Sequence, residues 1–263
     1  MVAASKMRRA QQAARAGRPF MQLLYRIQLA ATSHVVDEIS DPLLQVREVH
    51  KRAVILVSVD KGLCGALNSN LFRLADEFDA SSTVFITAGR KATQYVTQSG
   101  RQLAANFSYA DRPRFPEAKA IAACACDLFL KGEVDQVQIV ATRFVNTLVQ
   151  QPVCLEFLPV GEITGLKLEG SEAAGESADR NVDFLFEPSA QAVVGYLLSH
   201  YLNLCVYQTL LNAKASEHSA RMVSMKAATE NAQGLIKELT LQYNKLRQES
   251  ITNELLDIAG GQA

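Results

Sequence analysis

The chain has 263 residues, and its 48% hydrophobic and 21% charged residues predict a soluble protein with a real core. Its 27 basic and 27 acidic residues balance, so the net charge offers no argument for a nucleic-acid-binding protein. The sequence has no apolar run of the ~18 residues that are needed to span a bilayer. We therefore expect membrane association only through partners.

Residues 1–41 have the pattern of one Ala-rich helix, which Asp41-Pro42 ends. A kink is expected just before Pro19, because proline cannot continue the hydrogen bonding of a helix. The first 26 residues carry six basic residues and no acidic one, a composition that is also typical of a mitochondrial transit peptide. Serine is sparse there and the helical pattern continues to Ile39, which favours a helix of the mature protein.

Residues 52–188 alternate short apolar runs with helical patterns, the order of an α/β domain. The almost continuously apolar run 53–59 is typical of a strand buried on both faces of a sheet. We predict a Rossmann-like α/β domain with a largely parallel sheet. The acidic, Gly- and Ser-rich stretch 165–183 is expected to be a surface loop. The predicted strands are 53–59, 83–87, 137–142 and 153–158, and the predicted helices are 68–78, 89–98 and 117–130.

Residues 189–260 contain no proline, and the stretch 189–258 reads as one helix about 105 Å long. Seam residues recur along it in alternating steps of four and three, the repeat of a left-handed coiled coil. The Ala-rich N-terminal helix is the expected partner. Because the α/β domain between the two helices lets the chain turn back, we predict an antiparallel coiled coil. The seam comprises Leu197, Tyr201, Leu204, Gln208, Leu211, Ala215, His218, Met222, Met225, Thr229, Ala232, Ile236, Leu239, Tyr243 and Leu246.

The connection 60–70 follows the first predicted strand and carries Gly62 and Gly65. Such a turn can bind phosphate, but neither the dinucleotide motif nor the P-loop motif is present, and the alternative is a purely structural tight turn. Cys64 is either a reactive thiol at a helix start or a small buried residue. The cysteines and histidines show no metal-site spacing, so we expect no metal and no cofactor. His218 falls on the seam and is expected to be packed in the core.

Several segments resemble the ATP synthase gamma subunits, and together they extend over the whole chain in order. They are MVAASKMRRAQ (1–11), DKGLCG (60–65), LNSN (67–70), FVNT (144–147), FLFEP (184–188), ASEHSARMVSMKAATENA (215–232) and LTLQYNKLRQESITNEL (239–255). Two departures from the family pattern occur. Ala66 replaces the second of two glycines that usually follow the cysteine, and the sequence begins several helical turns later than family members normally do.

The resemblance implies a non-catalytic subunit of a bacterial-type, F-type ATP synthase, a central rotor stalk. Its coiled coil is expected inside a hexamer of alpha and beta subunits, and its α/β domain on the epsilon subunit and the membrane c-ring. The complex is expected at the cytoplasmic face of the bacterial inner membrane, with this chain as a peripheral protein. The competing classes are a free-standing coiled-coil scaffold, which assembles without these subunits, and an enzyme whose isolated α/β domain binds nucleotide.

The resemblance also identifies charged and polar residues as contacts to the alpha and beta subunits. The alternative is that each is a solvated helix residue, because exposed charges contribute little to stability. The matching contact residues are Arg247 and Gln248 on the last helix and Lys6, Arg8 and Arg9 on the facing helix. Further surface candidates on the last helix are Glu217, Lys226 and Glu230.

Overall fold

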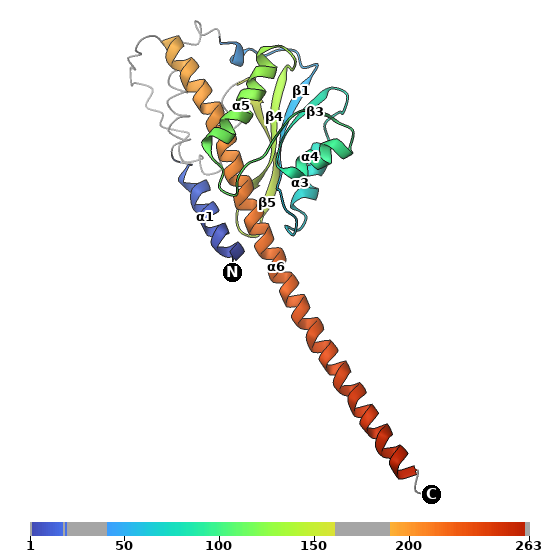
Figure 1. The fold of residues 1–263 in the computed structure, drawn as a ribbon. Coiled ribbons are helices and arrows are strands. Elements are labelled where there is room, and N and C mark those ends of the chain that lie inside the picture. Colours follow the sequence, from blue (N-terminus) through green and yellow to red (C-terminus); the bar gives the residue numbers. More distant parts are fainter. Residues whose placement is uncertain (1, 18, 20–40, 161–189, 261–263) are drawn as a thin grey trace. The chain divides into compact units, whose positions relative to one another are not determined.

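A computed structural model describes residues 2–17, 19, 41–160 and 190–260 of the chain (Figure 1). The chain divides into two compact units, Met1–Met222 and Val223–Ala263. The predicted kink before Pro19, the predicted continuation of the first helix to residue 41 and the predicted loop 165–183 fall outside the described residues or at their margins. None of the described helices is both long and apolar enough to cross a membrane.

The first unit contains a five-stranded sheet with the strand order β3-β2-β1-β4-β5. Four strands are parallel and β5 is antiparallel to β4, so the predicted largely parallel sheet is confirmed. One strand, β3, was not predicted, because it is an edge strand in which exposed positions alternate with only partly buried ones. The strands are β1 (Arg52–Val57), β2 (Thr83–Ala88), β3 (Gln102–Phe107), β4 (Gln136–Phe144) and β5 (Gln150–Leu158).

Strand β1 lies between two helical layers, which explains its apolar sequence. Val54 and Leu56 pack in one cluster with the helices α3 (Leu67–Ala75) and α4 (Arg90–Gln98). The alternate side chains of β1, among them Ile55, pack in a second cluster with α5 (Phe115–Leu130) and the long helix α6 (Ala190–Gly260). Successive side chains of a strand point to opposite faces, so both faces of β1 must be apolar. A short 3-10 helix, η1 (Pro42–Leu44), precedes the sheet.

The N-terminal helix α1 (Val2–Ala16) packs against α6 and runs in the opposite direction (Figure 1). The Gln208 side-chain amide donates a hydrogen bond of 2.7 Å to the carbonyl of Ala14. Further along α6, Lys214 lies near Asp111, the residue that Lys6 of α1 also contacts. From Gln208 to Lys214 along α6, the neighbouring residue on α1 moves back from Ala14 toward Lys6. The predicted antiparallel pairing is therefore confirmed for these residues.

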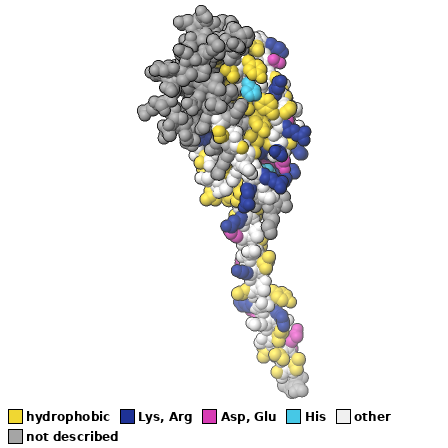
Figure 2. All heavy atoms as spheres, turned by 90° about the vertical axis from the view of Figure 1, so that its left-hand side faces the viewer, with side chains coloured by type: hydrophobic (Ala, Val, Ile, Leu, Met, Phe, Trp, Pro, Cys, Tyr) yellow, Lys and Arg dark blue, Asp and Glu magenta, His cyan; other side chains and the backbone are white. Residues whose placement is uncertain are grey.

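The predicted C-terminal helix is confirmed as α6, a single helix of 71 residues. Along the first unit its seam is buried, for example at Tyr201, Gln208, Leu211 and Ala215. In the second unit, every residue from position 226 to 260 is exposed (Figure 2). Hydrophobic and charged side chains are mixed on its surface.

Candidate functional site

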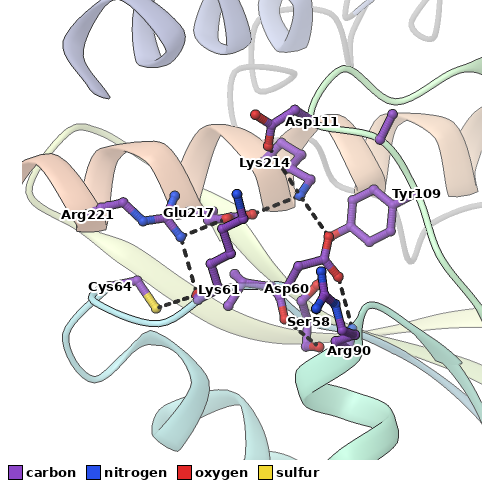
Figure 3. Close-up of polar contacts among 12 residues, drawn as sticks. Ser58, Asp60, Lys61, Cys64, Arg90, Tyr109, Asp111, Lys214, Glu217 and Arg221 are labelled. Carbon is purple, nitrogen blue, oxygen red and sulfur yellow. Dashed lines mark hydrogen bonds and ion pairs between the residues drawn. The ribbon is translucent and has the colours of Figure 1, made fainter. Parts of the chain in front are cut away.

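Charged residues of α6 gather at one edge of the parallel sheet (Figure 3). The carboxyl ends of β1 and β3 lead into loops that contain Asp60 and Asp111, and the carboxyl end of β2 leads through Gly89 to Arg90, the first residue of α4. Carboxyl ends of parallel strands meet at the same edge, which is where open α/β sheets commonly bind ligands. In this chain α6 occupies that edge, at the residues Lys214, Glu217 and Arg221.

Lys214 is a buried cation, with only 1% of the residue exposed. Its Nζ lies 3.0 Å from Glu217 Oε2, 3.7 Å from Asp60 Oδ2 and 3.9 Å from Asp111 Oδ1. The same nitrogen is 4.6 Å from the centroid of the Tyr109 ring. A buried charge is tolerated only when it is paired and hydrogen-bonded. These contacts therefore hold α6 to the loops that follow β1 and β3.

Glu217 extends this group of contacts to a third residue of α6. It is 1% exposed, and its Oε1 accepts a hydrogen bond of 2.8 Å from Arg221. The guanidinium of Arg221 also donates to the backbone carbonyls of Lys61 and Gly62, at 3.2 and 3.3 Å. The prediction that Glu217 is a surface residue is therefore wrong. Helical periodicity does not reveal that a distant loop covers this face of α6.

The amide groups at the start of α4 are occupied by side chains of the same chain. Asp60 accepts a hydrogen bond from the Arg90 N–H at 3.0 Å, and Ser58 Oγ accepts one from the Ala92 N–H at 2.6 Å. Free N–H groups at a helix start are what a phosphate binds. The Tyr109 hydroxyl donates to the Ser58 carbonyl at 2.8 Å, which fixes the end of β1 as well. The start of α4 is therefore not free to bind a phosphate, whereas the phosphate alternative for the turn 60–70, which leads into α3, stays a prediction.

The loop after β1 also has the features of a structural turn. Gly65 has a φ of 59°, in the left-handed region that favours glycine. Leu63 also has a positive φ, of 63°, whereas Gly62 does not. Cys64 is buried, and burial raises the pKa of its thiol above the ordinary value. A raised pKa disfavours the reactive thiolate. Cys64 therefore fits the small buried residue of the two alternatives.

His218 completes the interior of this edge, as its seam position predicted. It is 3% exposed, and burial lowers its pKa, while Glu217 and Asp111 act in the opposite direction. The imidazole is therefore neutral near pH 7.

The pKa of the Asp111 carboxyl at the same edge is lowered, first of all by the hydrogen bond from Lys6. Within residues 2–17, 41–160 and 190–260, no cluster of His, Cys, Asp or Glu side chains is arranged to hold a metal ion.

The structure places the five predicted contact residues in different settings. Lys6 pairs with Asp111 of the same chain and is half-exposed. Arg8 and Arg9 are exposed on α1, and Arg247 and Gln248 are exposed in the second unit. Their contacts with other subunits stay a prediction.

The group of Lys214, Asp60 and Asp111 was not predicted from the sequence, although one signal was available. The small residues around Lys214 occupy every face of the helix, which indicates close packing on all sides (the stretch Ala213–Ala220).

The fold and this edge define a structural protein, in which a long helix is fastened to an α/β domain by buried ion pairs. Comparison with known proteins identifies the kind of structural protein. The sequence model of the ATP synthase family matches residues 1–263. A relative from Opitutus terrae named ATP synthase gamma chain is 43% identical, over 100% of this chain and 90% of its own length. A gamma chain from Methylacidiphilum infernorum is 39% identical with the same coverage. The chain belongs to the family of ATP synthase gamma chains.

Solved structures support the same fold. A chain from the central stalk and c-ring structure of the Tetrahymena thermophila mitochondrial ATP synthase has a TM-score of 0.64 and 24% identity, with 87% of this chain and 96% of that chain covered. A chain from the Euglena gracilis mitochondrial ATP synthase has a TM-score of 0.61 and 20% identity, with 98% and 94% covered. The comparisons offer no support for the free-standing scaffold.

Proposed function

We propose that this gamma chain is the central rotor shaft of an F-type ATP synthase and contributes no catalytic group. The observation that carries the proposal is the match to gamma chains over the full sequence, together with a continuous helix of 71 residues. A shaft must transmit torque along its length, and a long helix anchored at one end in a packed domain suits that task. ATP hydrolysis and synthesis belong to other subunits.

The second unit is the part that enters the hexamer of alpha and beta subunits in this proposal. Its exposed apolar side chains are numerous, and large exposed apolar areas mark surfaces that bind partners. Lys226, Glu230, Lys245 and Glu249 provide both signs of charge on the same surface, which limits uniform adhesion to the hexamer. The exposed apolar residues are Leu235, Ile236, Leu239, Leu241, Tyr243, Leu246, Ile251, Leu255, Leu256 and Ile258.

The α/β domain is the foot of the shaft, and it contacts the epsilon subunit and the membrane c-ring. Ion flow through the ring turns the foot, and the helix carries this rotation to the catalytic beta subunits. The chain is then a peripheral protein at the cytoplasmic face of the bacterial inner membrane, held there by its partners. In this proposal residues 1–41 and 189–260 form the coiled coil, and residues 52–188 form the foot.

Arg247 and Gln248 provide the test of the contacts with the beta subunits. Replacing both with Ala keeps the helix, because Ala is the best helix former. We expect a fully assembled complex in which ATP synthesis falls about tenfold, the factor that corresponds to the loss of one charged hydrogen bond of about 1.4 kcal/mol. The measurement is ATP synthesis and ATP-driven ion pumping by reconstituted complexes, with subunit stoichiometry checked.

The matched control is the double variant Lys245→Ala/Glu249→Ala. These two exposed residues lie on the same part of α6, with their charged groups 4.0 Å apart. An exposed pair of this kind contributes little, so the control is expected to synthesise ATP at the normal rate. Equal rates in both variants at full assembly would show that Arg247 and Gln248 are solvated residues, and would leave the family assignment unchanged.

A further inference from the structure

A short stretch of α6, Ala213–Ala220, is buried on every face of the helix. This is unusual, because a helix that packs on one side keeps a polar, exposed face. The surroundings come from several directions. Ala14 of α1 and Phe144 of β4 pack with Ala215, and the loop after β1 contributes Val59 and Cys64, which pack with Ala220. We call Ala213–Ala220 the enclosed segment.

Apolar packing alone fixes the rotational position of the enclosed segment about the helix axis only weakly. The apolar side chains of this stretch are alanines, and its other small residues are Ser216 and Ser219. Apolar attraction is non-directional, and small side chains form only shallow ridges that interlock little with their neighbours. Small side chains therefore resist a turn of the enclosed segment about the helix axis only weakly, whereas the larger Leu202, Val206 and Leu210 anchor α6 earlier in the domain.

The ion pairs supply the directional contacts that the alanines lack. Lys214 is paired with Asp60 and Asp111, and Arg221 donates to the carbonyls of Lys61 and Gly62, so two separate loops of the domain are bound. Successive helix residues are about 100° apart around the axis. A turn of the helix by one position would take the charges of Lys214 and Glu217 away from their partners within a buried environment, at a large desolvation cost.

We infer that Lys214, Glu217 and Arg221 are positioning residues that lock the rotational position of the enclosed segment, the last part of α6 that is buried in the domain, so that the foot and the shaft turn as one body. The inference rests on the proposed function as a rotor shaft. Lys6 extends the lock to α1 through its ion pair with Asp111, which also contacts Lys214. This role resembles that of a buried polar residue in a coiled coil, which fixes register and adds little stability.

The test exploits the difference between stability and positioning. Replacing a buried ion pair with apolar residues of similar volume is often neutral or stabilising for the fold. The double variant Lys214→Met/Glu217→Leu removes the two fully buried members together, and it is expected to melt close to the temperature of the unchanged chain, because the remaining charged partners Asp60, Asp111 and Arg221 reach solvent. In a reconstituted ATP synthase it is expected to hydrolyse ATP, but to lose most of the ion gradient that it can sustain, because the enclosed segment twists without its directional contacts when the opposing torque rises. Pumping against a small gradient persists.

A second variant and a control complete the experiment. Arg221→Met removes the contacts with Lys61 and Gly62 from a partly exposed position, keeps the Lys214–Glu217 pair, and is expected to lower the maximal gradient to an intermediate value. The control Arg101→Met/Asp76→Leu removes a pair at 3.2 Å inside the same domain that does not involve α6. It weakens the domain, yet the complex is expected to sustain the normal gradient.

The outcomes separate the two claims. If the unchanged chain does not assemble with alpha and beta subunits, the proposed function fails. If it assembles and pumps, and the variants sustain the same maximal gradient as the unchanged chain, the lock is refuted and the rotor function stands. If the double variant does not fold, Arg221→Met alone decides between these results. A reduced gradient in the Arg101→Met/Asp76→Leu control as well would also refute the lock, because general weakening of the domain would then explain the effect.

Discussion

Glu217→Ala is expected to lower the free energy of unfolding of the full chain by about 3 kcal/mol, because it leaves buried charges without their best partner. Removing one member of a buried ion pair typically costs about 3–5 kcal/mol. The lower end of this range applies, since Lys214 keeps Asp60 at 3.7 Å and Asp111 at 3.9 Å. Arg221 loses its 2.8 Å contact but keeps the carbonyls of the neighbouring loop. Denaturant unfolding of the purified chain measures the change.

Glu230→Ala is the matched control on the same helix. Its carboxylate lies 3.9 Å from Lys226, and both side chains are largely exposed. An exposed pair at this spacing contributes less than about 0.5 kcal/mol, so the control is expected to unfold at nearly the normal denaturant concentration. Similar losses in both variants would mean that burial of the Glu217 pair has no special weight in the stability of this domain.

Gly89→Ala is expected to destabilise the chain by about 3–4 kcal/mol, through strain and a steric clash together. Gly89 precedes α4 with φ 102° and ψ 147°, a conformation that is open essentially to glycine alone. A Cβ there would lie 2.3 Å from the carbonyl oxygen of Ser58. That oxygen accepts the hydrogen bond from Tyr109, so the clash also disturbs the end of β1. Thermal and denaturant unfolding of the variant measure the loss.

Gly100→Ala separates the strain from the clash. Gly100 has φ 66°, and nothing lies within 4 Å of the position that a Cβ would take. The expected cost is about 1 kcal/mol, the cost of a left-handed backbone for alanine. If Gly89→Ala were no more destabilising than Gly100→Ala, the close approach of the Ser58 carbonyl to the start of α4 would be without energetic consequence.

Most of the fold was predictable, because its strongest elements carry local signals. The apolar run of β1 indicates a strand that is covered on both faces, and the proline-free stretch with a 3.5-residue repeat indicates the helix α6. The edge strand β3 carries no such signal. Only one of its faces is partly buried, and the polar Gln102 and Asn106 break its apolar pattern. Its place in the sheet is determined by pairing with β2, which is a tertiary contact.

The group of ion pairs was harder to predict, because its members lie far apart in the sequence. Asp60, Asp111 and Lys214 come from three separate elements and meet only when the sheet edge closes around α6. The seam repeat placed His218 correctly in the core, whereas the family resemblance placed the neighbouring Glu217 on the surface, and the repeat gave no sign to the contrary. A repeat detects one buried face of a helix, whereas the stretch Ala213–Ala220 is buried on all faces.

Rotation of the chain inside its complex is the direct test of its role as a rotor. Cys154 on β5 is exposed while Cys64 and Cys205 are buried, so a probe can be attached at Cys154 once the half-buried Cys124 and Cys126 are replaced with Ala. The labelled chain is assembled with alpha and beta subunits that are fixed to a surface. A shaft predicts that the probe turns in one direction while ATP is supplied and stops when ATP is removed. A complex that hydrolyses ATP at the normal rate with a stationary probe would show that the chain is not a rotor shaft.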